Sequence, residues 1–157
     1  MHTFTSSKMD YCNAVFCGIT DKAIGRLQRI QNAAARVLTG TKCRAHITPV
    51  LKSLHWLKVE YRIEYKALLL VYKSLHGQAP RYMSDMLVGY TPGRPLRSEG
   101  TGLLKVPRIK TKHGEASFSF FAPTRWNALP LSLKMAETVE LFKRDLKTHL
   151  FSRAFRD

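Results

Sequence analysis

The most apolar stretch of the chain, residues 54–77, predicts a buried central helix. Gly77 stands where the glycine that follows a helix C-terminus is expected. At about 100° per residue, the second half of the stretch has one narrow polar arc, made of Arg62, Lys66 and Lys73. Apolar and aromatic residues fill the rest of the circumference, so we expect other helices to surround this one. The face left to water is then basic.

A second amphipathic helix is predicted between a cap at Thr20 and the terminating Gly40. The residues expected on its buried face are Ile24, Leu27, Ile30, Ala34, Val37 and Leu38. Those on the roughly opposite arc are Lys22, Arg26, Arg29 and Arg36. No acidic residue occurs between Lys22 and Val59. This helix therefore provides a second cationic stripe.

Shorter helices are predicted on both sides of the central one. Thr48 and Pro49 indicate the cap and first residue of a helix that continues into the central one after a kink near Leu57. Pro80 precedes a short helix over residues 81–88.

The C-terminal part of the chain returns to a helical pattern. Residues 114–130 predict a short aromatic helix, a break at Pro123 and a second turn that ends at Pro130. The last helix is expected over residues 138–155. Its inward side chains would be Val139, Phe142, Leu146, Leu150 and Phe151.

Residues 90–114 interrupt these helices, because three prolines and four glycines break any helical period. The cations of this segment are Arg94, Arg97, Lys105, Arg108, Lys110 and Lys112. Residues 103–109 predict one short strand, which Pro107 confines to a sheet edge. We therefore predict a mainly α fold: a single-domain helical bundle around a central helix, with an irregular basic segment and one short β-strand or hairpin. The expected parts of this single domain, residues 1–157, are a helical core at 9–89, the basic segment at 90–114 and C-terminal helices at 115–157.

The charge balance narrows the choice of partners. The chain carries 26 Lys and Arg against 11 Asp and Glu, a formal net charge of +15. A polyanion would relieve the electrostatic self-repulsion of the chain, so nucleic acid is the leading candidate partner and an anionic membrane the next. The alternative is a basic soluble protein with no polyanionic partner.

Three cysteines are too few for a disulfide scaffold, and their number is odd. Without a transmembrane run or a signal-peptide core, nucleus or cytoplasm is the expected location, and no membrane association is predicted.

Catalytic and metal-binding patterns are weak. The carboxylates are scattered singly, and Glu60 and Glu64 are interpreted as ordinary surface charges on a helix face. Neither the set Cys43, His46 and His55 nor the pair Cys12 and Cys17 has the spacing of structural zinc. We therefore predict no metal, no cofactor, no small-molecule substrate and no enzymatic activity. An independent hydrolase, tested by alanine at His46, His55 and His76, is the least favoured alternative. Trp56 and Trp126 are interpreted as core residues rather than as platforms for bases.

Several motifs, in order along almost the whole chain, resemble one family. They are Asp10-Tyr11-Cys12-Asn13, residues 26–36 (RLQRIQNAAAR), Ile47-Thr48-Pro49-Val50-Leu51, Leu54-His55-Trp56-Leu57, residues 72–77 (YKSLHG), Leu96-Arg97-Ser98, Val106-Pro107-Arg108 and Trp126-Asn127-Ala128-Leu129-Pro130. Together they are similar to the C-terminal, post-polymerase and thumb-adjacent region of reverse transcriptases from non-LTR retrotransposons (LINE-type, jockey and chicken-repeat-like clades). The chain departs from that family at Lys58, where proline is usual, and at Val15 and Phe16, where leucines are usual.

The resemblance implies a module that grips template RNA or target DNA. The family's polymerase carboxylates lie upstream of the matched region, so no catalytic residue carries over. The resemblance also implies that the chain is a fragment which lacks the helix partners of residues 9–19 and exposes apolar surface.

The predicted function is therefore non-catalytic, sequence-tolerant binding of RNA or DNA phosphates. The expected contact residues are Lys22, Arg26, Arg29, Arg36, Arg62, Lys66, Lys73, Arg97, Arg108, Lys110 and Lys112. The upstream reverse transcriptase domain is a second expected partner. Two alternatives stay open: a protein-interaction module for the rest of the polyprotein, and a decayed element fragment with no selected activity.

Overall fold

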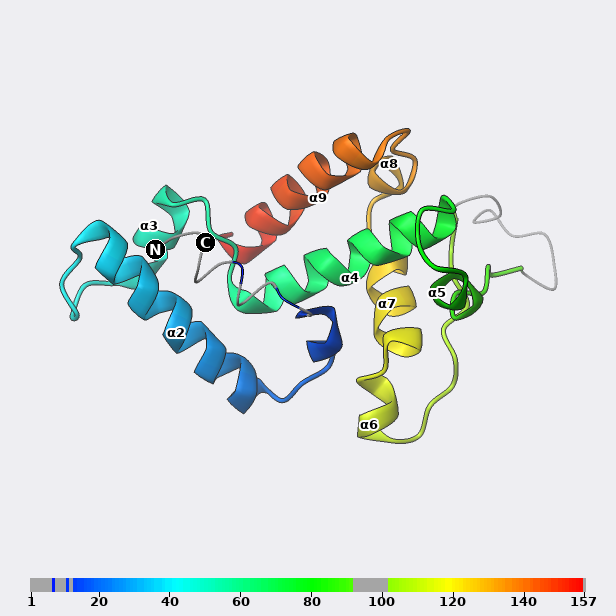
Figure 1. Ribbon diagram of the computed structural model, residues 1–157, viewed down its shortest axis with the longest axis horizontal. Coiled ribbons are helices and arrows are strands. Elements are labelled where there is room, and N and C mark those ends of the chain that lie inside the picture. The colour runs from blue at the N-terminus through cyan, green and yellow to red at the C-terminus, as the bar shows by residue number, and fades with distance from the viewer. Residues whose placement is uncertain (1–6, 8–10, 12, 92–101, 157) are drawn as a thin grey trace.

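The computed structural model describes residues 7, 11, 13–91 and 102–156, and over these residues the protein is mainly helical (Figure 1). Its elements are the 3₁₀ helix η1 (Asn13–Phe16) and the helices α2 (Asp21–Thr39), α3 (Ile47–Ser53), α4 (Val59–Leu75), α5 (Arg81–Asp85), α6 (Lys112–Glu115), α7 (Phe118–Asn127), α8 (Leu131–Lys134) and α9 (Val139–Ala154). The predicted fold class is thus confirmed. Among the described helices, none has the length and apolar character that spanning a bilayer requires.

Helix α4 is the centre of the fold, as its apolar pattern predicted. Figure 1 shows it in the middle of the molecule, with α9 along one side and α7 on the other. Ala67, Leu68 and Val71 are fully buried. The helix ends as expected at Gly77, which has φ +68° and lets the Gln78 N–H donate to the Lys73 carbonyl at 2.8 Å.

An aromatic stack joins α4, α7 and α9. The rings of Tyr72 and Phe142 stack with centroids 4.3 Å apart, and Trp126 lies at 6.0 Å from Phe142. The buried Tyr72 hydroxyl donates to the Ala136 carbonyl at 2.6 Å, so its one polar atom is satisfied. The inward residues predicted for the last helix are confirmed: α9 buries Val139, Phe142, Leu146 and Leu150, and Phe151 is half-buried.

Helix α2 has the predicted ends but not the predicted buried face. It begins after Thr20 and ends at Gly40, which is left-handed with φ +66°, although the Thr20 side chain makes no capping hydrogen bond. Ile30 and Val37 were expected in the core, yet they are 56% and 66% exposed. The fully buried residues are Gln31 and Ala35 instead. Leu38 is also exposed, whereas Ile24, Leu27 and Ala34 are half-buried.

Two glutamines explain this rotation of α2. The connection between α3 and α4 carries backbone groups that no helix ladder satisfies. Gln31 Nε2 donates to the Leu57 carbonyl at 2.8 Å, and the Val59 N–H donates to Gln28 Oε1 at 2.9 Å. Because unsatisfied buried backbone groups cost about 1–3 kcal/mol each, the amides take the core side of α2 and turn half of its apolar stripe outward.

The α3–α4 connection also differs from the prediction. The residue before α3 is His46 rather than Thr48, and its side chain makes no capping hydrogen bond, so Pro49 lies in the first turn instead of at its first position. The expected kink near Leu57 is a complete break between the two helices, in which His55 adopts φ +51°. This break is what exposes the backbone groups that α2 binds.

The expected breaks and strand further along the chain were wrong. Helix α7 runs through Pro123, whose ring is buried in the core. Over the described part of residues 88–109 there is no strand, only an isolated antiparallel bridge between Gly89 and Leu104. Asn127 explains this, because its side chain accepts from the Leu104 N–H at 2.9 Å and donates to the Leu104 carbonyl at 2.8 Å. The side-chain amide takes the place of a neighbouring strand.

The N-terminal segment finds a partial partner in α4. Cys17 is buried in a small cluster with Val59, Ile63 and Ala67, separate from the main core. Tyr11, Val15 and Phe16 remain exposed, which agrees with the prediction that this segment displays apolar surface.

Candidate nucleic-acid interface

The predicted cations of α2 fall into two groups. Lys22, Arg26 and Arg29 are exposed on the outer face of the helix. Arg36 is half-buried instead: its guanidinium donates to the Ala45 carbonyl at 3.3 Å, and its Nε is buried without a partner among the described residues. The first three cations are thus available to a ligand, whereas Arg36 mainly holds the loop after α2.

The predicted basic arc of α4 exists but is partly covered. Arg62, Lys66 and Lys73 are half-buried and share the arc of α4 that faces away from its fully buried side. A lysine or arginine can extend its charged head to water along such an arc while its stem packs on apolar neighbours. These residues can contribute charge, but less freely than those of α2.

The basic segment between α5 and α7 supplies a third group. Arg108 and Lys110 are exposed, and so is Lys105. Lys112 is the first residue of α6. Arg97 and the side chain of Lys112 lie outside what the structure describes.

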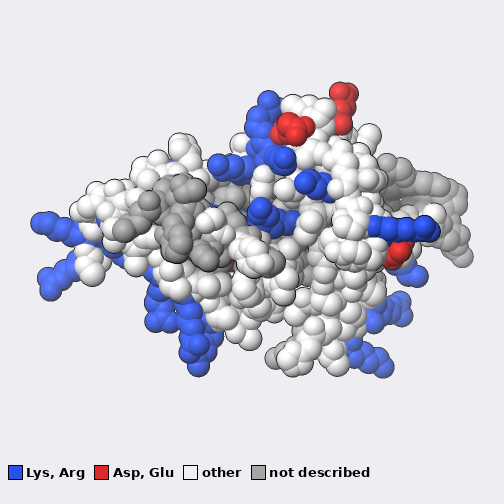
Figure 2. Space-filling view, viewed as in Figure 1, with Lys and Arg blue, Asp and Glu red and all other residues white. Residues whose placement is uncertain are grey.

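On the face shown in Figure 2, Lys and Arg side chains lie in separate groups rather than in one strip. Figure 2 shows blue atoms over the lower half of α2, at its far left end, over the α4–α9 region and along the right-hand side, with uncharged surface between them. Red atoms are few on this face and lie mainly at the α8–α9 end. Such an arrangement fits a flexible or wrapping polyanion better than a single groove.

Ion pairing leaves the outer cations free. In the described part of the chain, the carboxylate pairs include Glu140 with Lys143, Asp145 with Arg144 and Glu64 with Arg153. Within the described residues, none of Lys22, Arg26, Arg29, Arg108 and Lys110 forms an ion pair with a carboxylate.

Among the exposed cations that sequence reasoning missed are Lys42 and Arg44, in the loop after α2. The acid-free run from Lys22 to Val59 contains both and could have indicated them. Trp56 and Trp126 are buried, which confirms them as core residues. Among the described residues, the exposed Phe and Tyr rings are those of Tyr11, Phe16, Tyr82 and Tyr90, for which the sequence gives no distinguishing signal.

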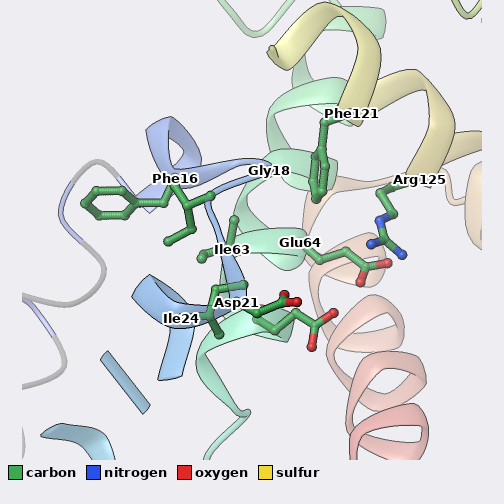
Figure 3. A pocket seen from close by; sticks show the side chains of 10 residues that line it. Phe16, Gly18, Asp21, Ile24, Ile63, Glu64, Phe121 and Arg125 are labelled. Atoms are coloured by element: carbon green, nitrogen blue, oxygen red, sulfur yellow. The ribbon is translucent and has the colours of Figure 1, made fainter. Parts of the chain in front are cut away.

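The carboxylates are less scattered than the sequence suggested. A cavity of about 140 Å³ is lined by Asp21, Glu60 and Glu64, with Arg125 on its wall (Figure 3). Glu64, interpreted from the sequence as a surface charge, is only 2% exposed and accepts from the Arg153 guanidinium at 2.8 Å. Figure 3 shows Arg125 reaching from α7 towards Glu64. Among the described residues, no three His, Cys, Asp or Glu side chains are grouped so that they could hold a metal ion.

Two of the three histidines of the hydrolase alternative make structural contacts, and these are separate. His76 stacks on Tyr72 with ring centroids 3.9 Å apart, and its Nδ1 lies 2.8 Å from the Tyr72 carbonyl oxygen. His55 packs against Phe151 at 5.9 Å, and His46 precedes α3. The structure brings no pair of them into contact.

Burial should make the two described cysteines react very differently. Loss of solvation raises the pKa of Cys17 to about 11, so at pH 8 it is a neutral, poorly nucleophilic thiol. Cys43 is exposed. We expect iodoacetamide at pH 8 to alkylate Cys43 at least about tenfold faster than Cys17, as followed by peptide mass mapping. Equal rates in the folded protein would contradict the packing of Cys17 on α4, and equal rates in denaturant serve as the control.

Compared with known proteins, the chain matches no family model, no curated protein and no solved structure. The resemblance to non-LTR reverse transcriptases therefore stays a prediction from the motifs. In the structure, several of these motif residues have architectural contacts. Gln28 and Gln31 clamp the α3–α4 connection, while Trp126 and Asn127 hold residues 102–104 by hydrogen bonds.

Proposed function

We propose that the protein is a non-catalytic nucleic-acid-binding segment of a non-LTR retrotransposon reverse transcriptase. The observation that carries this proposal is the set of exposed cations without carboxylate partners on α2 and in residues 105–110. In a chain of net charge +15, an anionic ligand at these positions would neutralise positive charge that no carboxylate of the described residues pairs with.

The proposed binding is driven by the release of counterions from phosphates. Each Lys or Arg that meets a phosphate frees counterions, which favours binding without reading the base sequence. The buried state of Trp56 and Trp126 removes the two candidate stacking residues that the sequence offered. Backbone contacts are therefore the proposed source of affinity, with Lys22, Arg26 and Arg29 as the first group to engage.

Neutralising the outer face of α2 should flatten the salt dependence of binding. We expect the triple variant Lys22→Gln/Arg26→Gln/Arg29→Gln to bind RNA and DNA oligonucleotides more weakly at low salt. Its slope of log K against log salt should be shallower than that of the unchanged protein by about 2 to 3. Fluorescence anisotropy between about 50 and 200 mM salt measures this slope.

The matched control is Lys143→Gln/Arg144→Gln on α9, because both of these cations already pair with carboxylates. This variant should change the slope by less than the α2 variant does. Affinity that hardly varies with salt in the unchanged protein would refute the proposal, as would equal effects of the two variants.

A further inference from the structure

The outer face of α2 carries an apolar stripe that the fold does not cover. Ile30, Ala33 and Val37 are spaced by three and four residues, so they lie on one side of the helix, and all three are exposed. Contiguous exposed apolar residues of this kind mark interaction sites more often than scattered ones do.

The helix cannot bury this stripe by rolling about its own axis. Gln31 and Gln28 are tied to Leu57 and Val59 by the hydrogen bonds that fix the core side of α2. A roll that brought Ile30 inward would break both bonds and leave buried polar groups unpaired. Within the described residues, a roll of α2 therefore offers no way to bury the stripe.

Cations bracket the stripe at both ends. Arg26 and Arg29 precede it on the same side of the helix, and Lys42 and Arg44 follow it in the loop, all of them exposed. No acidic residue lies between Lys22 and Val59 to balance them. The complementary surface would thus be apolar in the middle and acidic at both ends.

We propose that this face of α2 docks an acidic amphipathic helix of a partner protein. The partner would present apolar residues at helical spacing against Ile30, Ala33 and Val37, and the small Ala33 would allow the close interaxial approach of packed helices. Its acidic flanks would meet Arg26 and Arg29 at one end and the cationic loop at the other. Such rim charges set orientation and speed association, while the apolar centre holds the complex.

Charge disfavours the other occupants of this face. A second copy of the chain would bring Arg26 and Arg29 towards an equally cationic surface on a molecule of net charge +15. Nucleic acid would satisfy the cations but would leave the aliphatic side chains without apolar partners. The stripe also has no Trp, Tyr or Phe, the residues that favour the interface of a lipid bilayer.

Binding of a designed peptide tests this proposal without relying on the proposed function. The probe is a synthetic peptide of about 20 residues with leucines along one helical face and glutamates on its flanks. A shuffled peptide of the same composition has no apolar face. We expect the first peptide to bind the full chain, and Ile30→Gln/Val37→Gln to weaken that binding at least about tenfold, as measured by fluorescence anisotropy.

The matched control variant is Tyr82→Gln/Met86→Gln, another exposed apolar pair, in helix α5 and directly after it, which should leave peptide binding unchanged. Because all four side chains are exposed, both variants should keep the melting temperature, and the Ile30/Val37 variant should keep its affinity for RNA. Equal binding of the shuffled peptide, or no effect of the Ile30/Val37 variant, would overturn the proposal. Two further results would overturn it: the chain self-associates, or it binds anionic phosphatidylserine vesicles, and the Ile30/Val37 variant abolishes that association or binding. A second copy or a lipid surface would then be the occupant of this face.

Discussion

Replacing Trp126 by alanine is expected to lower the free energy of unfolding by about 3–5 kcal/mol. The indole is 2% exposed and packs near Phe142, so its removal would leave a large cavity between α7 and α9. The variant also loses the hydrogen bond from the indole N–H to the Gly102 carbonyl, 2.8 Å long, which holds the basic segment on α7. Urea unfolding followed by circular dichroism measures the change.

Trp126→Phe provides the matched control, because it keeps much of the ring volume and gives up mainly the hydrogen bond. We expect it to cost clearly less than Trp126→Ala. Where the alanine variant still folds, its affinity for RNA should equal that of the unchanged protein, since the ring is not available to a base. A variant with normal stability and weakened RNA binding would show that the ring stacks on a base instead.

Replacing Arg153 by methionine is expected to destabilise the protein by about 2 kcal/mol, because it leaves the Glu64 carboxylate buried without its partner. The full cost of an orphaned buried charge is larger, about 3–5 kcal/mol. We expect less here because the Arg153 side chain is 36% exposed and water can reach the site. The loss is measured by urea unfolding near neutral pH.

The double variant Glu64→Gln/Arg153→Met should be more stable than Arg153→Met alone, since it removes the orphaned charge. Arg144→Met on the same helix is the control, because Arg144 and Asp145 are both well exposed and their pair should contribute under about 1 kcal/mol. If Arg153→Met cost no more than Arg144→Met, the pair between α4 and α9 would have no energetic importance.

Periodicity and capping predicted much of the helical framework. The central helix, the last helix with its inward residues, and the ends of α2 at Gly40 and of α4 at Gly77 follow from the sequence. These features depend on neighbours within a few residues, and a local pattern contains that information.

Three of the errors share one cause. The buried face of α2, the buried Glu64 and the missing strand at 103–109 each depend on a polar group that finds its partner far along the chain. Gln31 and Leu57 are 26 residues apart, Asn127 and Leu104 are 23 apart, and Glu64 and Arg153 are 89 apart. The helical pattern of α2 could not reveal that an amide, rather than Ile30, would be needed on its inner side.

In the candidate interface, too, some features follow from the sequence and others only from the tertiary structure. The sequence by itself determined the cationic excess, the acid-free run and the helical spacing of Lys22, Arg26 and Arg29. Only the tertiary structure decided that these three face water while Arg36 is drawn inward, and that Ile30 and Val37 lie exposed beside them. The physical reason is that the order of residues along the chain fixes the composition and the helical spacing of side chains. The orientation of a helix is fixed by which buried polar groups must be satisfied after the chain has packed.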